Sequence, residues 1–138
     1  MVSLLIHVEQ YNVIGILPSQ LESLALVARA AGIGRTAFID STTDGVLRSW
    51  GFTRYGSLAA WLRAERPKHI SVFTPGGIDV RSARRFDDDW LAFGPAMGFN
   101  LSDFLGWEHQ LVGIPGGVLN SRDAVPIALW EVMTWPGQ

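Results

Sequence analysis

The sequence predicts a single α/β domain, residues 1–138, whose mainly parallel sheet has helices on both faces. Short apolar runs, rich in branched side chains, end in turns that contain Gly, Pro or Asp, as the buried strands of parallel sheets do. Segments with helical periodicity alternate with these runs. The chain has 138 residues, of which 48% are hydrophobic and 17% charged, so it is long enough to form one compact core.

Five segments are predicted to be strands of a five- or six-stranded sheet. Each is a short apolar run that a polar or glycine-containing turn follows. They are residues 2–8, 35–40, 69–73, 90–94 and 111–114. The carboxyl ends of parallel strands share one edge of a sheet, and ligands of open α/β sheets bind there. We therefore expect any functional site at that edge.

Two helices are predicted between the first three strands. Ser19 and Glu22 form a capping box at the start of the first helix, which Gly32 can end. Ser57 caps the second, short helix, and Pro67 stops it.

A third helix is predicted near the end of the chain, and it carries the prediction of a partner. It should begin near Asp123, because this start places Pro126 in the first turn, where no bonded N–H is lost. Its apolar residues form two faces, Val125, Ala128, Leu129 and Val132 on one and Ile127, Trp130 and Trp135 on the other. A helix that is apolar on both sides needs a second covering surface, so we predict a homodimer through it.

Charge and composition exclude several classes of function. The net charge of -2 and the pI near 5.8 do not indicate the basic surface of a free-standing nucleic-acid-binding protein, which counts against an RNA substrate. Without cysteine there is no disulfide, thiolate nucleophile or cysteine zinc site. The apolar start is too short for a signal peptide or membrane span, so we expect a cytoplasmic protein with no membrane partner.

The histidines and one charged run are further candidates for a functional site. His7, His69 and His109 do not have the spacing of metal ligands, and a core position is the simpler interpretation of His7. Residues 81–89 carry arginines and then aspartates and are most simply a solvated connection. Adjacent aspartates cannot all face one ion, so a magnesium site fits them less well. We predict no metal.

Aromatic and glycine motifs leave alternatives open. In residues 49–56 (SWGFTRYG) aromatic side chains alternate with arginine, a pattern that suits base stacking and equally a loop packing its own rings. Paired glycines occur at Gly76-Gly77 and Gly116-Gly117. They indicate either two turns whose bare backbone approaches a ligand or each other, or simply two tight turns.

The most specific motifs lie in the last third of the chain. Gly94-Pro95-Ala96-Met97-Gly98 follows one predicted strand, and Ile114-Pro115-Gly116 follows another. Leu119-Asn120 comes next, with Glu131 eleven residues beyond Asn120. In order and spacing these residues resemble the second and third motifs of the SpoU branch of the SPOUT RNA methyltransferases. Residues 18–32 (PSQLESLALVARAAG) resemble a degenerate first motif, with Arg29 at the position of the family's arginine.

The resemblance implies a TrmH-type domain with a C-terminal trefoil knot. Such a domain binds S-adenosylmethionine in its knot loops and methylates a ribose 2′-hydroxyl of RNA as a homodimer. The implied cofactor-binding residues are Phe93, Gly94, Gly98, Ile114, Gly116, Leu119 and Asn120. Arg29 is implied to be catalytic by approaching the hydroxyl, and Asn120 by ordering the last loop. No metal is required, because the sulfonium already activates the methyl group.

Three departures from the family pattern keep alternatives open. Ser23 stands where the first motif has asparagine, Ala96 stands where the second has glutamate, and Val118 replaces serine in a shortened loop. The lost side chains at Ser23 and Ala96, together with the acidic composition, favour a non-catalytic dimeric module of the same fold. The acidic composition favours a methyltransferase that acts on a small molecule rather than on a polyanion.

Overall fold

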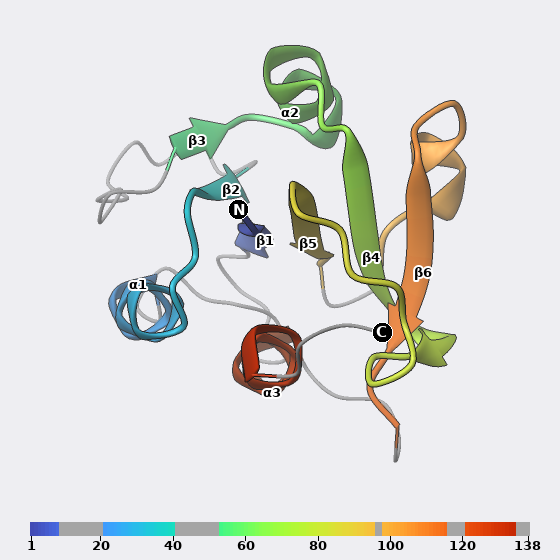
Figure 1. Ribbon diagram of the computed structural model, residues 1–138. Coiled ribbons are helices and arrows are strands. Elements are labelled where there is room, and N and C mark those ends of the chain that lie inside the picture. The colour runs from blue at the N-terminus through green and yellow to red at the C-terminus, as the bar shows by residue number, and fades with distance from the viewer. Residues whose placement is uncertain (9–20, 41–52, 96–97, 116–120, 135–138) are drawn as a thin grey trace.

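The computed structural model describes residues 1–8, 21–40, 53–95, 98–115 and 121–134. These residues form a six-stranded sheet of order β3-β2-β1-β5-β4-β6 (Figure 1). Every neighbouring pair of strands is parallel. The strands are β1 Ser3–Val8, β2 Thr36–Asp40, β3 Thr53–Tyr55, β4 His69–Asp79, β5 Asp89–Phe93 and β6 His109–Gly113. The predicted parallel α/β architecture is confirmed.

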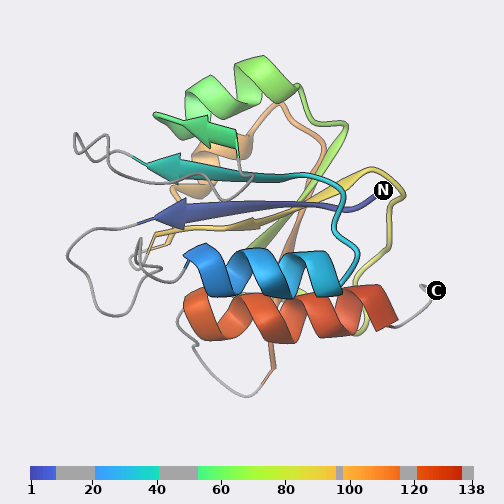
Figure 2. The same cartoon turned by 90° about the vertical axis from the view of Figure 1, so that its left-hand side faces the viewer.

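Helices cover both faces of the sheet, as expected. The helices α1 (Leu21–Ala30) and α3 (Ser121–Thr134) lie side by side on one face (Figure 2). The helix α2 (Leu58–Glu65) and the short 3-10 helix η2 (Leu101–Phe104) lie on the other. Side chains of the central strands β1, β2 and β5 alternate between two buried layers, which is why these strands are mostly apolar.

Two hydrophobic cores result from this alternation. In β1, Leu4 and Ile6 face α1 and α3, whereas Leu5 faces α2. The helices contribute Leu24, Ala28, Val125 and Leu129 to the first core and Trp61, Leu62 and Phe104 to the second. Burying a side chain of this size stabilises the fold by about 1.5–3 kcal/mol. In the described part of the chain no helix is long and apolar enough to span a bilayer.

The predicted cap of α2 is confirmed, but the predicted start of α3 is wrong. The hydroxyl of Ser57 accepts a hydrogen bond from the Ala60 amide at 3.1 Å. The helix α3 starts at Ser121 rather than near Asp123, so Pro126 lies in its second turn and cannot donate a bond to the preceding turn. The buried neighbour Val125 holds this turn against the sheet, so packing outweighs the missing bond.

Strand β4 is longer than predicted. It continues through the expected turn at residues 74–77 as far as Asp79, with a register shift between Phe73 and Ile78, which both lie opposite Val112. Residues 74–77 therefore form a bulge. A Cβ atom on Gly77 would lie 2.5 Å from the carbonyl carbon of Val112, so the missing side chain lets β4 approach β6.

The aromatic motif and the charged connection also differ from expectation. Thr53–Tyr55 forms the edge strand β3 beside β2, while Trp50 and Phe52 lie outside the described residues. The connection from β4 to β5 is not simply solvated, because Val80 and Ala83 are buried against β6 and α3. Arg85 donates to the carbonyls of Val80 and Ala83 and holds this segment together.

We predict that Gly77→Ala lowers the free energy of unfolding by about 1–3 kcal/mol, because the methyl group collides with the β6 backbone. Urea denaturation measures this change. Gly56→Ala is the control, since no atom of the described residues lies within 4 Å of its Cβ position, and it should change the free energy by less than about 1 kcal/mol. Equal effects at the two glycines would contradict the role of the close approach.

Candidate functional site

The two segments that carry the motifs start at the same edge of the sheet. Phe93, the last residue of β5, pairs with Phe73 of β4, and Phe73 pairs with Val112 of β6. The ends of β5 and β6 are therefore level, with β4 between them. At the usual strand spacing they lie roughly 10 Å apart. This places Gly94 and Ile114 at one carboxyl edge, where parallel sheets bind ligands.

The bulge of β4 at residues 74–77 fills the position between the two segments. A Cβ atom on Gly113 would lie 3.1 Å from the carbonyl oxygen of Gly77 and 3.2 Å from that of Thr74. The bulge therefore packs on the backbone that leads into Ile114. The composition of residues 74–77 predicts a turn, so the sequence alone does not identify them as a third segment of the candidate site. Residues 74–77 lie at the site because β4 is between β5 and β6 in the sheet, and local sequence patterns do not reveal this strand order.

Gly94, Pro95 and Gly98 are the described residues of the segment that follows β5. The Gly98 amide donates to the carbonyl of Pro95 at 2.7 Å, and Gly98 has a φ of 83°. Among the residues that the structure describes, no atom lies within 4 Å of the position that a Cβ of Gly98 would occupy, so these residues leave its backbone open to a ligand. Gly94 differs, since its Cβ position lies 2.8 Å from the ring of Phe99.

Phe93 and Ile114 contribute in different ways. Phe93 is 2% exposed and its ring stacks on Phe73, with ring centroids 4.4 Å apart, so the ring is part of the core and is not available to a ligand. Ile114 is half-buried and packs against both the α3 core and the cluster around Val80. It offers part of an apolar side chain at the edge.

An ion pair borders the end of β6. Asp79 pairs with Gly113, and the Arg81 guanidinium lies 2.7 Å from the Asp79 carboxylate. The hydrogen bonds from Arg81 hold the pKa of Asp79 below its ordinary value. Because this pair is largely exposed, solvent weakens the attraction between the two charges.

The remaining predicted site residues are not gathered at this edge within the described chain. Ala96, Gly116, Val118, Leu119 and Asn120 lie outside the described residues. Ser23 is exposed near the start of α1 and Arg29 is exposed in its last turn. The helix α1 runs back toward the amino ends of the strands, where the Gly34 amide donates to the Val2 carbonyl at 2.9 Å (Figure 2). Arg29 thus lies toward the edge opposite Gly94 and Ile114 of its own chain.

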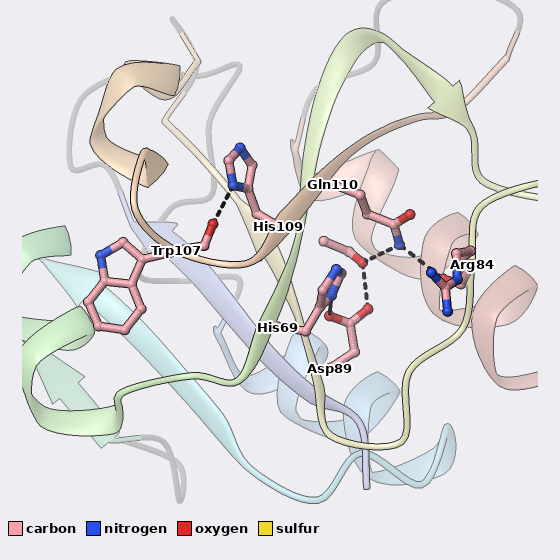
Figure 3. Close-up of polar contacts among 7 residues, drawn as sticks. His69, Arg84, Asp89, Trp107, His109 and Gln110 are labelled. Carbon is pink, nitrogen blue, oxygen red and sulfur yellow. Dashed lines mark hydrogen bonds and ion pairs between the residues drawn. The ribbon is translucent and has the colours of Figure 1, made fainter.

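A buried polar network occupies the amino ends of β4, β5 and β6 (Figure 3). His69 Nδ1 lies 2.8 Å from Asp89 Oδ1, and the Ser71 hydroxyl donates to Asp89 Oδ2. The Gln110 amide donates to Ser71 Oγ and to the Arg84 carbonyl, both at 2.9 Å. The network therefore ties the connection between β4 and β5 to three strands.

This network has the residue types of a catalytic triad without its geometry. Ser71 donates to Asp89 rather than to His69, so no base is placed to activate the hydroxyl. The ring of Phe86 also covers His69, with centroids 3.6 Å apart. Burial raises the pKa of Asp89 despite the hydrogen bonds that it accepts from Ser71 and His69. We assign the network a structural role.

The described ranges contain no group of three or more His, Cys, Asp or Glu side chains that could hold a metal ion. The candidate site therefore rests on described backbone at the carboxyl edge, residues 74–77, residues 94–95 with Gly98, and residues 113–115. They offer backbone groups and apolar side chains, which suits an organic ligand more than a cation.

The sequence matches no protein-family model and no curated protein, but the structure resembles solved methyltransferases. A Bacillus anthracis protein assigned as an RNA methyltransferase has a TM-score of 0.66 at 16% identity, over 99% of this chain and 97% of that one. A structure described as giving insight into 2-OH methylation on tRNA has a TM-score of 0.64 at 22% identity, over 95% and 88%.

A third similar structure was solved with a cofactor. The SpoU methyltransferase AviRb from Streptomyces viridochromogenes, in complex with AdoMet, has a TM-score of 0.67 at 16% identity. The match covers 96% of this chain and 59% of AviRb. The chain thus has the fold of SpoU-type methyltransferase structures, as the sequence resemblance implies.

We predict a pH dependence of stability from Asp89. Because its folded-state pKa is raised above the ordinary value of 3.8, the folded protein holds the proton more tightly than the unfolded chain. Its contribution is complete below 3.8 and is lost as the pH rises through the folded-state pKa. The free energy of unfolding of the wild type relative to Asp89→Asn should therefore fall across this window.

Urea denaturation at a series of pH values measures this difference. Asp103→Asn, at an exposed aspartate on η2, is the control for loss of a carboxylate. A difference between wild type and Asp89→Asn that stays constant or grows with pH would contradict the assignment.

Proposed function

We propose that the chain is an S-adenosylmethionine-dependent methyltransferase that methylates a ribose 2′-hydroxyl of RNA as a cytoplasmic homodimer. The observation that carries the proposal is the level arrangement of Gly94 and Ile114, twenty residues apart in sequence, at one carboxyl edge. Both begin segments with SpoU-like motifs. The similarity of the fold to SpoU methyltransferases, one of them in complex with AdoMet, supports the same conclusion.

The described residues fit the cofactor. The open backbone of Gly98 can approach a ligand closely, and Ile114 offers apolar surface to an adenine ring. The proposal assigns the backbone of Phe93 and Gly94, at the end of β5, to the same site. In the proposal Gly116, Leu119 and Asn120 complete the site, and the C-terminal segment passes through a trefoil knot. Knots depart from the usual rules of chain connection, so only the family resemblance supports this element.

The chemistry assigns different tasks to cofactor and protein. Bound S-adenosylmethionine supplies a methyl group that its sulfonium already activates, so the transfer itself requires no metal. The protein must hold the acceptor hydroxyl in line with this group and accept its proton. We assign the approach to the hydroxyl to Arg29 and the ordering of the last loop to Asn120. Because Arg29 lies toward the opposite edge of its own chain, the proposal requires it to act in the partner's site.

Exposed apolar side chains support a second copy as the partner. Ile127 and Trp130 of α3 are 42% and 68% exposed, and Leu26 of the neighbouring α1 is 58% exposed. Burial of apolar area contributes about 25 cal/mol per Å², so an interface of standard size can offset the entropy of association. Ile127 and Trp130 are thus the described part of the predicted second apolar face of α3.

A second candidate is a methyltransferase for a small molecule, or a non-catalytic module of the same fold. Ser23 lacks the amide group that the family carries in its first motif, and Ala96 lacks the carboxylate of the second. The net charge of -2 also suits a compact substrate better than a polyanion. Cofactor binding without methyl transfer to RNA would favour this candidate.

Calorimetry with S-adenosylmethionine tests the proposal. We expect saturable binding of about one molecule per chain with a negative heat-capacity change, because apolar surface is buried. Methyl transfer to a pool of total RNA, followed with a labelled methyl group, then distinguishes the two candidates. An absence of binding at millimolar cofactor would overturn every enzymatic version.

We predict that Trp130→Glu converts the homodimer to a monomer, because it places a charge in the apolar interface. Sedimentation velocity at micromolar concentration measures the change. Leu105→Glu is the matched control, since Leu105 is 72% exposed and lies beside η2 on the other face of the sheet. A wild type that is already monomeric, or a Trp130→Glu variant that stays dimeric, would contradict the arrangement.

A further inference from the structure

We propose that Phe99 is a positioning residue, which sets the backbone at Gly94, Pro95 and Gly98 for cofactor binding by packing its ring on Gly94. This inference rests on the proposed function. It adds a residue that lies outside the motifs and that does not have to touch the cofactor. It also gives Gly94 a role different from close approach to a ligand.

The contact between Phe99 and Gly94 is direct. A Cβ atom built on Gly94 would lie 2.8, 3.0 and 3.1 Å from Cδ2, Cγ and Cε2 of the Phe99 ring. The ring therefore occupies the space that a side chain at position 94 would need. Real Cβ atoms do not approach other atoms this closely, so only glycine accommodates the ring without a shift.

Two contacts hold the described residues after β5, the packing of the Phe99 ring on Gly94 and a backbone hydrogen bond between Gly98 and Pro95. The Gly98 amide donates to the Pro95 carbonyl at 2.7 Å, and Phe99 follows directly and returns to Gly94. The described residues leave the space beside the Gly98 backbone open. The conformation of the open backbone thus depends on the contact at Gly94.

The core fixes the ring in turn. Phe99 meets Phe104 edge to face, with centroids 5.2 Å apart and planes at 85°. Phe104 is fully buried in the core beneath α2, and its carbonyl accepts a bond from the Trp107 amide at 3.1 Å. Asn100, the N-cap residue of η2, accepts hydrogen bonds at Oδ1 from the Ser102 amide and hydroxyl. A continuous set of contacts therefore runs from the core to the turn.

Loss of the ring would free the turn without removing any cofactor contact. The binding-competent conformation would then be populated for a smaller fraction of the time, and the apparent affinity falls by that fraction. If Phe99→Ala leaves this conformation at about one part in ten, the dissociation constant of S-adenosylmethionine rises about tenfold.

The experiment is a double-mutant cycle measured by calorimetry with S-adenosylmethionine. Phe99→Ala and Gly94→Ala should each weaken binding about tenfold, the second because its methyl group displaces the ring. The double variant should bind no more weakly than Phe99→Ala alone, because the methyl group then has space. Phe99→Leu keeps an apolar side chain over Gly94 and should weaken binding less than Phe99→Ala. Leu105→Ala, at an exposed residue of the same connection, is the control.

The outcomes separate this inference from the proposed function. Unfolding midpoints are measured in parallel, and binding is compared at a temperature at which every variant is folded. A wild type that binds and a Phe99→Ala variant that binds within about twofold of it would overturn the positioning role alone. Effects of Phe99→Ala and Gly94→Ala that multiply in the double variant would overturn it too. A wild type without affinity for S-adenosylmethionine would overturn the proposed function and this inference together.

Discussion

The parallel pairing of β4 with both β5 and β6 is the constraint on which the candidate site depends. Phe73 of β4 has Phe93 on one side and Val112 on the other, so the segments after β5 and β6 begin at the same level. Gly77 maintains this arrangement, because its bare backbone lets the far end of β4 stay against β6. A one-residue change in the register of either pair would move Gly94 and Ile114 apart along the strand direction.

The two edges of the sheet have different properties as a result. At the amino edge His69, Asp89 and Ser71 satisfy one another's hydrogen bonds beneath Phe86, which leaves a closed polar network. At the carboxyl edge, the described residues leave the backbone of Gly98 open, and a hydrogen bond from its amide to the Pro95 carbonyl holds it. A rigid scaffold with one open edge is the arrangement that parallel α/β proteins use for ligand sites.

Local patterns predicted the five longer strands, because burial on both sides leaves apolar runs, and they also predicted the Ser57 cap and the covered faces. The predicted cap at Ser19 lies outside the described residues. Local patterns failed where pairing decides the structure. Residues 74–77 have the composition of a turn, yet contact with β6 extends β4 through them. His69 and Asp89 lie twenty residues apart and become neighbours only through strand register. The strand ends predict that Gly94 and Ile114 lie at one edge of the sheet. The packing of Phe99 on Gly94 was not predictable, because it depends on how the connection between β5 and β6 folds back.

The central claim is that the carboxyl-edge segments bind S-adenosylmethionine, and an NMR titration tests it most directly. With assigned backbone amides, addition of S-adenosylhomocysteine, the product that retains the nucleoside, reports which residues sense the ligand. The account predicts the largest shifts in residues 74–77, at Gly98 and at Ile114, with little change around His69 and Asp89. Shifts concentrated at the amino edge, or none at saturating ligand, would contradict it.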